Sequence, residues 1–134
     1  MSADTPQPKT PIAMLWIGRI LSALPVPLLV MSSIMKLRKA PEVVDGIVKY
    51  GWPENVIFGL GVVELTCVIL YTIPQTAALG AILLTGYLGG AIATHVRMGE
   101  DWYFQFGFGV VLWLGLYFRD ARVRSLIPLR SLRP

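Results

Sequence analysis

Long apolar runs separated by short polar stretches dominate this sequence. Four runs carry almost no charge, and each, coiled into a helix that rises about 1.5 Å per residue, approaches or exceeds the bilayer's hydrocarbon thickness of about 30 Å. They cover residues 12–35, 56–73, 77–96 and 102–118, the last being the shortest. Because a bilayer core holds no water to satisfy backbone polar groups, such runs are expected to be helical. The pattern predicts an all-α integral membrane four-helix bundle, with a membrane domain over residues 12–118.

The polar stretches suggest how the spans are connected. In residues 36–54, the apolar side chains Val43, Val44, Ile47 and Val48 recur at helical spacing, which predicts a short interfacial amphipathic helix between spans one and two. The uncharged turn Pro74-Gln75-Thr76 predicts that spans two and three form an antiparallel hairpin. Residues 1–11 are expected to be a mobile N-terminal tail, and residues 119–134 a basic C-terminal tail.

Composition agrees with a membrane protein and excludes some chemistry. The chain is 54% hydrophobic and 15% charged, with a net charge of +4. Its basic residues gather at the ends of the apolar runs, where anionic lipid headgroups lie, so a nucleic-acid partner is not expected. The single cysteine, Cys67, lies inside an apolar run and excludes an intramolecular disulfide or a dithiol pair.

The sequence indicates the orientation of the protein in the membrane only weakly, because Lys and Arg divide almost evenly between the two sides of the predicted bundle. Five acidic residues crowd the side opposite the termini, which favours cytoplasmic N- and C-termini. They are Glu42, Asp45, Glu54, Glu100 and Asp101.

Charged residues within or beside the spans are the candidate functional residues, because burying charge in lipid is costly. Arg19 and Glu64 lie within spans, whereas Lys36, His95 and Arg97 lie near the membrane side at which span two begins. We expect Lys36, Glu64, His95 and Arg97 to line a polar pocket for an anion, a quinone-type headgroup or a proton.

Other arrangements are compatible with the same residues. Glu64 could instead pair with Arg19, stay protonated while Arg19 snorkels to the headgroups, or belong to a purely structural polar network. Because His95 is the only histidine, it supplies at most one ligand, and no metal site is expected.

Small residues and prolines predict local packing and bending. Gly86, Gly90 and Thr94 are spaced four apart on one face of span three, which is typical of close helix packing in membranes. Such a face more often packs within a bundle than against another protein. Pro25 and Pro27 are expected to kink span one.

Taken together, four segments give the chain a family resemblance. They are Ser33-Ile34-Met35-Lys36-Leu37, Gly51-Trp52-Pro53, Val63-Glu64-Leu65, and the stretch 84–97 that reads LTGYLGGAIATHVR. With them, residues 19–118 resemble the DoxX-like family of small four-helix membrane proteins. Ser33 is a mild departure, because the family usually has a small residue, often glycine, three positions before the lysine.

The resemblance implies a bacterial inner-membrane bundle, but most family members have no established activity. Some relatives look like membrane partners of sulfur- or oxidative-stress enzymes, including a thiosulfate:quinone oxidoreductase. We therefore expect a non-catalytic accessory or anchoring subunit, with the bilayer and a membrane or redox enzyme as partners and oligomers as an option. The alternatives are a quinone-linked oxidoreductase subunit, with quinone as its cofactor, and a small transporter.

Overall fold

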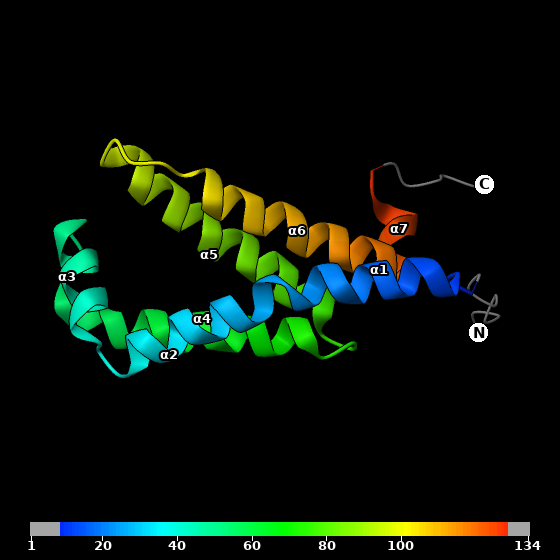
Figure 1. Cartoon of the computed structure of the whole chain (residues 1–134), viewed down its shortest axis with the longest axis horizontal. Helices are drawn as coiled ribbons and strands as arrows, with labels where there is room; N and C mark the ends of the chain where they lie inside the picture. Colours follow the sequence, from blue (N-terminus) through cyan, green and yellow to red (C-terminus); the bar gives the residue numbers. More distant parts are fainter. Residues whose placement is uncertain (1–8, 129–134) are drawn as a thin grey trace, which may run out of the picture.

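The computed structural model describes residues 9–128, and within this range every regular element is a helix (Figure 1). The all-α prediction is confirmed. The elements are α1 (Ile12–Ala23), α2 (Pro25–Leu37), α3 (Pro41–Lys49), the 3-10 turn η1 (Glu54–Val56), α4 (Ile57–Thr72), α5 (Ala77–Arg97), α6 (Tyr103–Arg119) and α7 (Ala121–Leu126).

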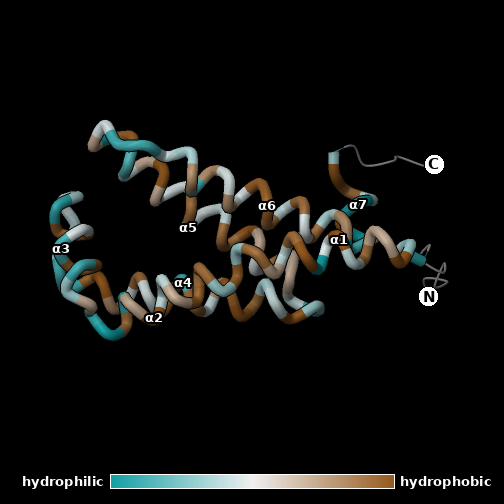
Figure 2. The backbone as a smooth tube through the Cα atoms, viewed as in Figure 1, coloured by the Kyte–Doolittle hydropathy of each residue, from teal (hydrophilic) through white to brown (hydrophobic). Residues whose placement is uncertain are grey.

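Three helical segments within the described residues are long and apolar enough to cross a membrane. They are Ile12–Leu37, Glu54–Thr72 and Ala77–Arg97, with 26, 19 and 21 residues. The fourth predicted span corresponds to α6, which has 17 residues and packs beside α1 and α5. Apolar residues occur along the length of all of these helices (Figure 2). Many large hydrophobic side chains, such as Phe58, Ile82 and Phe104, point outward, as expected for a surface that faces lipid.

The first membrane-capable segment is bent at its prolines. Leu24 separates α1 from α2, and Pro25 stands at the first position of α2, so the predicted kink is confirmed. The bend also changes the neighbour of this segment, because α1 packs mainly against α6 whereas α2 packs mainly against α4. At the end that carries α3, the α2–α4 pair and the α5–α6 pair therefore diverge (Figure 1).

Glycines allow the close helix crossings, but these glycines lie outside the face predicted from Gly86, Gly90 and Thr94. A Cβ added to Gly18 of α1 would lie 2.8 Å from the Gly115 carbonyl oxygen of α6, and one added to Gly61 of α4 would lie 3.0 Å from the Ser33 carbonyl oxygen of α2. One added to Gly80 of α5 would clash with the backbone of Tyr71.

The predicted packing face on α5 does not pack within the described chain. A Cβ added to Gly86 or Gly90 would meet no atom within 4 Å. Thr94, the third member, accepts a hydrogen bond from Trp52 Nε1 at 3.3 Å and donates one to the Gly90 carbonyl oxygen at 2.9 Å. The expectation of internal packing at this face is wrong, because α5 turns it away from α4 and α6.

The described part of the C-terminal segment is folded onto the bundle. Residues 121–126 form α7, and its Val123 is buried. Arg124 donates hydrogen bonds to the carbonyl oxygens of Tyr117 and Phe118 at 2.8 and 2.9 Å and to Thr10 Oγ1 at 2.8 Å. Arg124 thus satisfies carbonyls at the end of α6. The remainder of both predicted tails, residues 1–8 and 129–134, lies outside the described residues.

Candidate functional site

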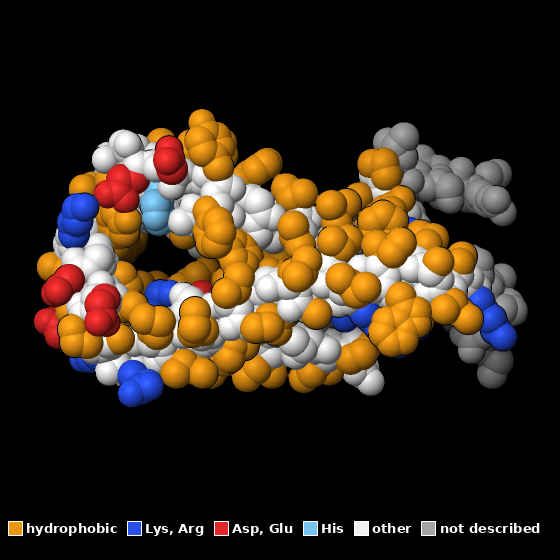
Figure 3. All heavy atoms as spheres, in the orientation of Figure 1, with side chains coloured by type: hydrophobic (Ala, Val, Ile, Leu, Met, Phe, Trp, Pro, Cys, Tyr) orange, Lys and Arg blue, Asp and Glu red, His pale blue; other side chains and the backbone are white. Residues whose placement is uncertain are grey.

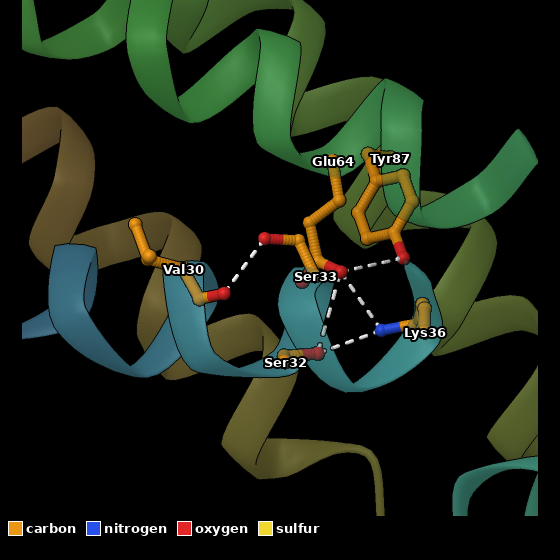
Figure 4. Close-up of polar contacts among 6 residues, drawn as sticks. All are labelled: Val30, Ser32, Ser33, Lys36, Glu64 and Tyr87. Carbon is orange, nitrogen blue, oxygen red and sulfur yellow. Dashed lines mark hydrogen bonds and ion pairs between the residues drawn. The ribbon is translucent and has the colours of Figure 1, made fainter. Parts of the chain in front are cut away.

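A buried ion pair joins α2 to α4 (Figure 4). Glu64 is 2% exposed, and its Oε2 accepts a hydrogen bond from Lys36 Nζ at 2.8 Å. The same oxygen accepts from Ser32 Oγ and from Tyr87 Oη, each at 3.3 Å. Lys36 Nζ also donates to Ser32 Oγ at 2.6 Å. Three helices thus converge on one carboxylate oxygen, a group that we call the Glu64 cluster (Ser32, Lys36, Glu64 and Tyr87).

The geometry of the Glu64 cluster follows from local helix spacing. Ser32 and Lys36 are four residues apart on α2 and therefore lie on the same helix face. Gly61, one turn before Glu64, lets α4 approach the backbone of Ser33, which shortens the reach between Lys36 and the carboxylate. Removing one member would leave the other charge buried and unpaired, which is far costlier than losing a surface pair.

The alternative pairing of Glu64 with Arg19 is not observed. The Arg19 guanidinium carbon lies 5.3 Å from the centre of the Trp16 ring, and the partner of Glu64 is Lys36. Arg19 shares a cavity with Pro74 and Gln75, so it lies at the end of the bundle that carries the α4–α5 turn.

His95 belongs to a second polar group near the opposite end of α5. Its Nδ1 lies 2.8 Å from the Ala91 carbonyl oxygen, which can only accept, so Nδ1 carries a proton. In the neutral ring, Nε2 is then an acceptor, and Gln105 Nε2 donates to it at 3.2 Å. Gln105 Oε1 is buried and has no hydrogen-bond partner among the described residues. We call His95, Gln105 and Tyr50, whose ring centroid lies 5.0 Å from that of His95, the His95 cluster.

The segment Lys49–Trp52, which we call the strap, ties the end of α3 to α5. Tyr50 Oη donates to Glu100 Oε2 at 2.6 Å, and Arg97 Nη2 donates to the Tyr50 carbonyl oxygen at 2.6 Å. Gly51 allows the sharp turn that follows, because its φ of +89° is a conformation that other residues rarely adopt. The strap therefore bridges the two diverging helix pairs at the α3 end.

Contact between the strap and Glu100 shifts the pKa values of Tyr50 and Glu100 in opposite directions. The hydrogen bond from Tyr50, together with the hydrogen bond and positive charge of Lys49, holds the pKa of Glu100 below its ordinary value. The same hydrogen bond, burial and the negative charge of Glu100 raise the pKa of the Tyr50 hydroxyl. Both shifts mean that the favoured state of the pair is a neutral tyrosine beside an ionised carboxylate.

The four predicted pocket residues thus divide between two places. Lys36 and Glu64 are in contact, whereas His95 and Arg97 contact the strap and α6. Tyr87 and His95 are about two turns apart on α5, or about 12 Å at about 1.5 Å per residue. Figure 3 shows a hollow between the diverging helix pairs, beside α3, with the histidine side chain at its rim.

Sequence reasoning missed Ser32, Tyr50, Tyr87 and Gln105, which supply much of the hydrogen bonding around the predicted residues. Ser32 could have been found from its spacing to Lys36 on the same helix face. No pattern along the chain indicates that Tyr87 faces Glu64 or that Gln105 faces His95, because this depends on how α5 and α6 are rotated.

Gln105 also borders an apolar cavity of about 620 Å³ between α5 and α6. The cavity extends along both helices towards α7, and its wall includes Leu88, Phe106, Trp113 and Ile127. A polar group thus stands at the edge of a long apolar surface. Within residues 9–128, no set of three or more His, Cys, Asp and Glu side chains is arranged to hold a metal ion.

An apolar core separates the Glu64 cluster from the end of the bundle that carries Arg19. This core includes Leu29, Tyr71, Leu84 and Leu112, all buried. The Tyr71 hydroxyl donates to the Leu112 carbonyl oxygen at 2.6 Å and lies 3.0 Å from Ser22 Oγ. The continuous polar path that a transporter would need between Glu64 and Arg19 is therefore interrupted.

These features define an all-helical membrane protein with a buried ion pair among its apolar helices. The chain belongs to the DoxX-like family, whose sequence model matches residues 20–118. Comparison with curated proteins and with solved structures gives no match. The resemblance noted from the sequence is confirmed, and the match includes both polar clusters.

Proposed function

We propose that this protein is a non-catalytic accessory or anchoring component of the membrane, and that its hollow binds the polar head of a small amphipathic molecule. The main support is the buried Glu64 cluster, which joins α2 and α4 of one diverging helix pair to α5 of the other. The Lys36 ammonium has three N–H donors, of which Ser32 and Glu64 occupy two, and its side chain is 14% exposed. One donor is left for an acceptor oxygen of a ligand.

The surroundings of the hollow favour an amphipathic ligand over a fully polar one. The unpartnered Gln105 Oε1 offers an acceptor beside His95, and the apolar cavity that begins at Gln105 matches a hydrocarbon or isoprenoid tail. Pockets of this kind orient a ligand with few polar groups and gain affinity from apolar contact.

A quinone-linked role is the second candidate. A quinone head carries two carbonyl acceptors, and the Lys36 ammonium and the His95 cluster supply polar groups at two separate places beside the hollow. In this alternative, the protein holds the quinone for a redox partner.

The proposal includes a topology of four spans, with α6 as the fourth, in a bacterial inner membrane and with cytoplasmic termini. The α4–α5 turn and the start of α1 lie at one end of the bundle, and α3 lies at the other (Figure 1). Reporter fusions after Thr10, Lys49, Gln75 and Gly99 should alternate between cytoplasm and periplasm. A fusion after Ile127 on the side opposite Thr10 would contradict a membrane-crossing α6.

The ligand proposal is tested by extracting the full chain in a mild detergent and identifying co-purified small molecules and proteins by mass spectrometry. We expect the double variant Lys36→Gln/Glu64→Gln, which leaves two neutral amides in place of the ion pair, to lose the bound molecule at least about tenfold. Asp45→Asn, which neutralises an exposed carboxylate on α3, is the matched control and should retain it.

The identity of the co-purified material separates the candidates. A quinone that depends on Lys36 and Glu64 favours the quinone-linked role, and a redox enzyme polypeptide together with another small amphiphile favours the accessory role. If the double variant folds and retains every molecule bound by the wild type, the hollow is not a ligand site.

A further inference from the structure

A second cavity lies at the other end of the bundle, where α1, the α4–α5 turn and α6 meet. Its volume is about 450 Å³, and three arginines from separate segments line it: Arg19 from α1, Arg119 from the end of α6 and Arg122 from α7. Asp120 is the acidic residue in its wall, and Gln75 contributes an amide. This cavity lies beyond the apolar core and shares no residue with the Glu64 and His95 clusters.

The arginines leave hydrogen-bonding capacity unused. Arg119 donates through Nη2 to the Tyr71 carbonyl oxygen at 3.0 Å, but its buried Nε has no partner among the described residues. No ion pair between an arginine and an acid is found in the described part of the chain. Asp120 Oδ1 accepts from the backbone N–H of Arg122 at 2.8 Å. The cavity wall thus holds one carboxylate and three guanidinium groups. The cavity has a net positive charge and at least one unsatisfied donor.

A helix terminus adds to this positive potential. Ala77, the first residue of α5, lies in the cavity wall, and no side chain caps the N-terminus of this helix. Unpaired N–H groups at the start of a helix carry partial positive charge and attract anions.

We infer that this cavity binds a phosphate-class anion. Planar guanidinium groups on several sides suit the oxygens of a phosphate, which they bind with charge-assisted and often bidentate hydrogen bonds. The cavity lies at the end of membrane-capable helices, where lipid phosphates are concentrated. The phosphate can belong to the headgroup of an anionic phospholipid or to free inorganic phosphate, and both present the same oxygens to the arginines.

Native mass spectrometry of the full chain in mild detergent tests this inference with two lipids, phosphatidylglycerol and phosphatidylcholine. Thermal unfolding with added inorganic phosphate is the parallel measurement. The variant is Arg19→Gln/Arg122→Gln, because both side chains are exposed and donate no hydrogen bond to the described protein, so the fold should persist. The matched control is Arg38→Gln/Lys39→Gln, which removes two exposed positive charges at the opposite end.

For a lipid headgroup, the wild type and the control should prefer phosphatidylglycerol over phosphatidylcholine, and the variant should bind phosphatidylglycerol at least about tenfold more weakly. For free phosphate, millimolar phosphate should raise the unfolding temperature of the wild type and the control, but not that of the variant, and should displace phosphatidylglycerol. If the folded variant matches the wild type in both measurements, or the control weakens binding equally, the site does not exist.

Discussion

Replacing Gly18 with alanine tests the α1–α6 crossing, a close contact that depends on a missing side chain. The new Cβ would lie 2.7 Å from the Arg119 backbone nitrogen, 2.8 Å from Arg119 Cβ and 2.8 Å from the Gly115 carbonyl oxygen. Two of these three neighbours are backbone atoms, which cannot rotate away. The two helices must therefore separate by several tenths of an ångström.

The expected magnitude follows from overpacking. Forcing one extra carbon into a closely packed contact costs about 1–3 kcal/mol. Against this, alanine favours helix by about 1 kcal/mol relative to glycine in water. The control Gly90→Ala gains the same helix preference without a clash, because its added Cβ meets nothing within 4 Å. The two variants should therefore differ by about 1–3 kcal/mol, with Gly18→Ala the less stable.

Thermal unfolding in one mild detergent, followed by circular dichroism, measures this difference. Gly18→Ala should unfold several degrees below Gly90→Ala, and Gly90→Ala should unfold at or above the wild-type temperature. Equal unfolding temperatures for the two variants would refute the close α1–α6 crossing. A large decrease in unfolding temperature for Gly90→Ala alone would instead support the packing face first expected on α5.

Two further predictions concern the charged groups. Lys36→Met should destabilise the fold by about 3 kcal/mol in detergent unfolding, because it leaves the carboxylate of Glu64 buried without its cation. The double variant Lys36→Met/Glu64→Gln should lose less stability, since it removes both charges. A double variant as unstable as the single one would contradict the pairing. The contribution of Glu100 to the strap should be fully present above the pKa of this carboxyl in the unfolded chain and should be lost as the pH falls through its lower pKa in the folded chain, below 4.5. The protection of the α3 amides, meaning their exchange rate relative to the intrinsic rate at each pH, should therefore decrease there. Glu100→Gln should remove this pH dependence, and constant protection across that range in the wild type would contradict it.

The candidate site was only partly predictable from the sequence. Glu64 and Lys36 were identifiable because charge within or beside an apolar run needs a partner or a function. That Lys36 rather than Arg19 is this partner depends on the bend at Pro25, which directs α2 towards α4 and α1 towards α6. The prediction that His95 and Glu64 share one pocket was too coarse. Tyr87 is the α5 residue that contacts Glu64, and His95 lies about two turns further along α5, where it contacts Gln105.

The sequence by itself determined the helices, their approximate ends and their affinity for lipid. Residue type and run length decide these properties locally, since every backbone group in a bilayer must be bonded within its own helix. Only the tertiary structure decided which faces meet. In lipid the outer faces are as apolar as the inner ones, so hydrophobic periodicity does not distinguish the packing of Gly18 and Gly80 from the open position of Gly90. Steric fit between whole helices makes that distinction, and it is a property of the assembled bundle.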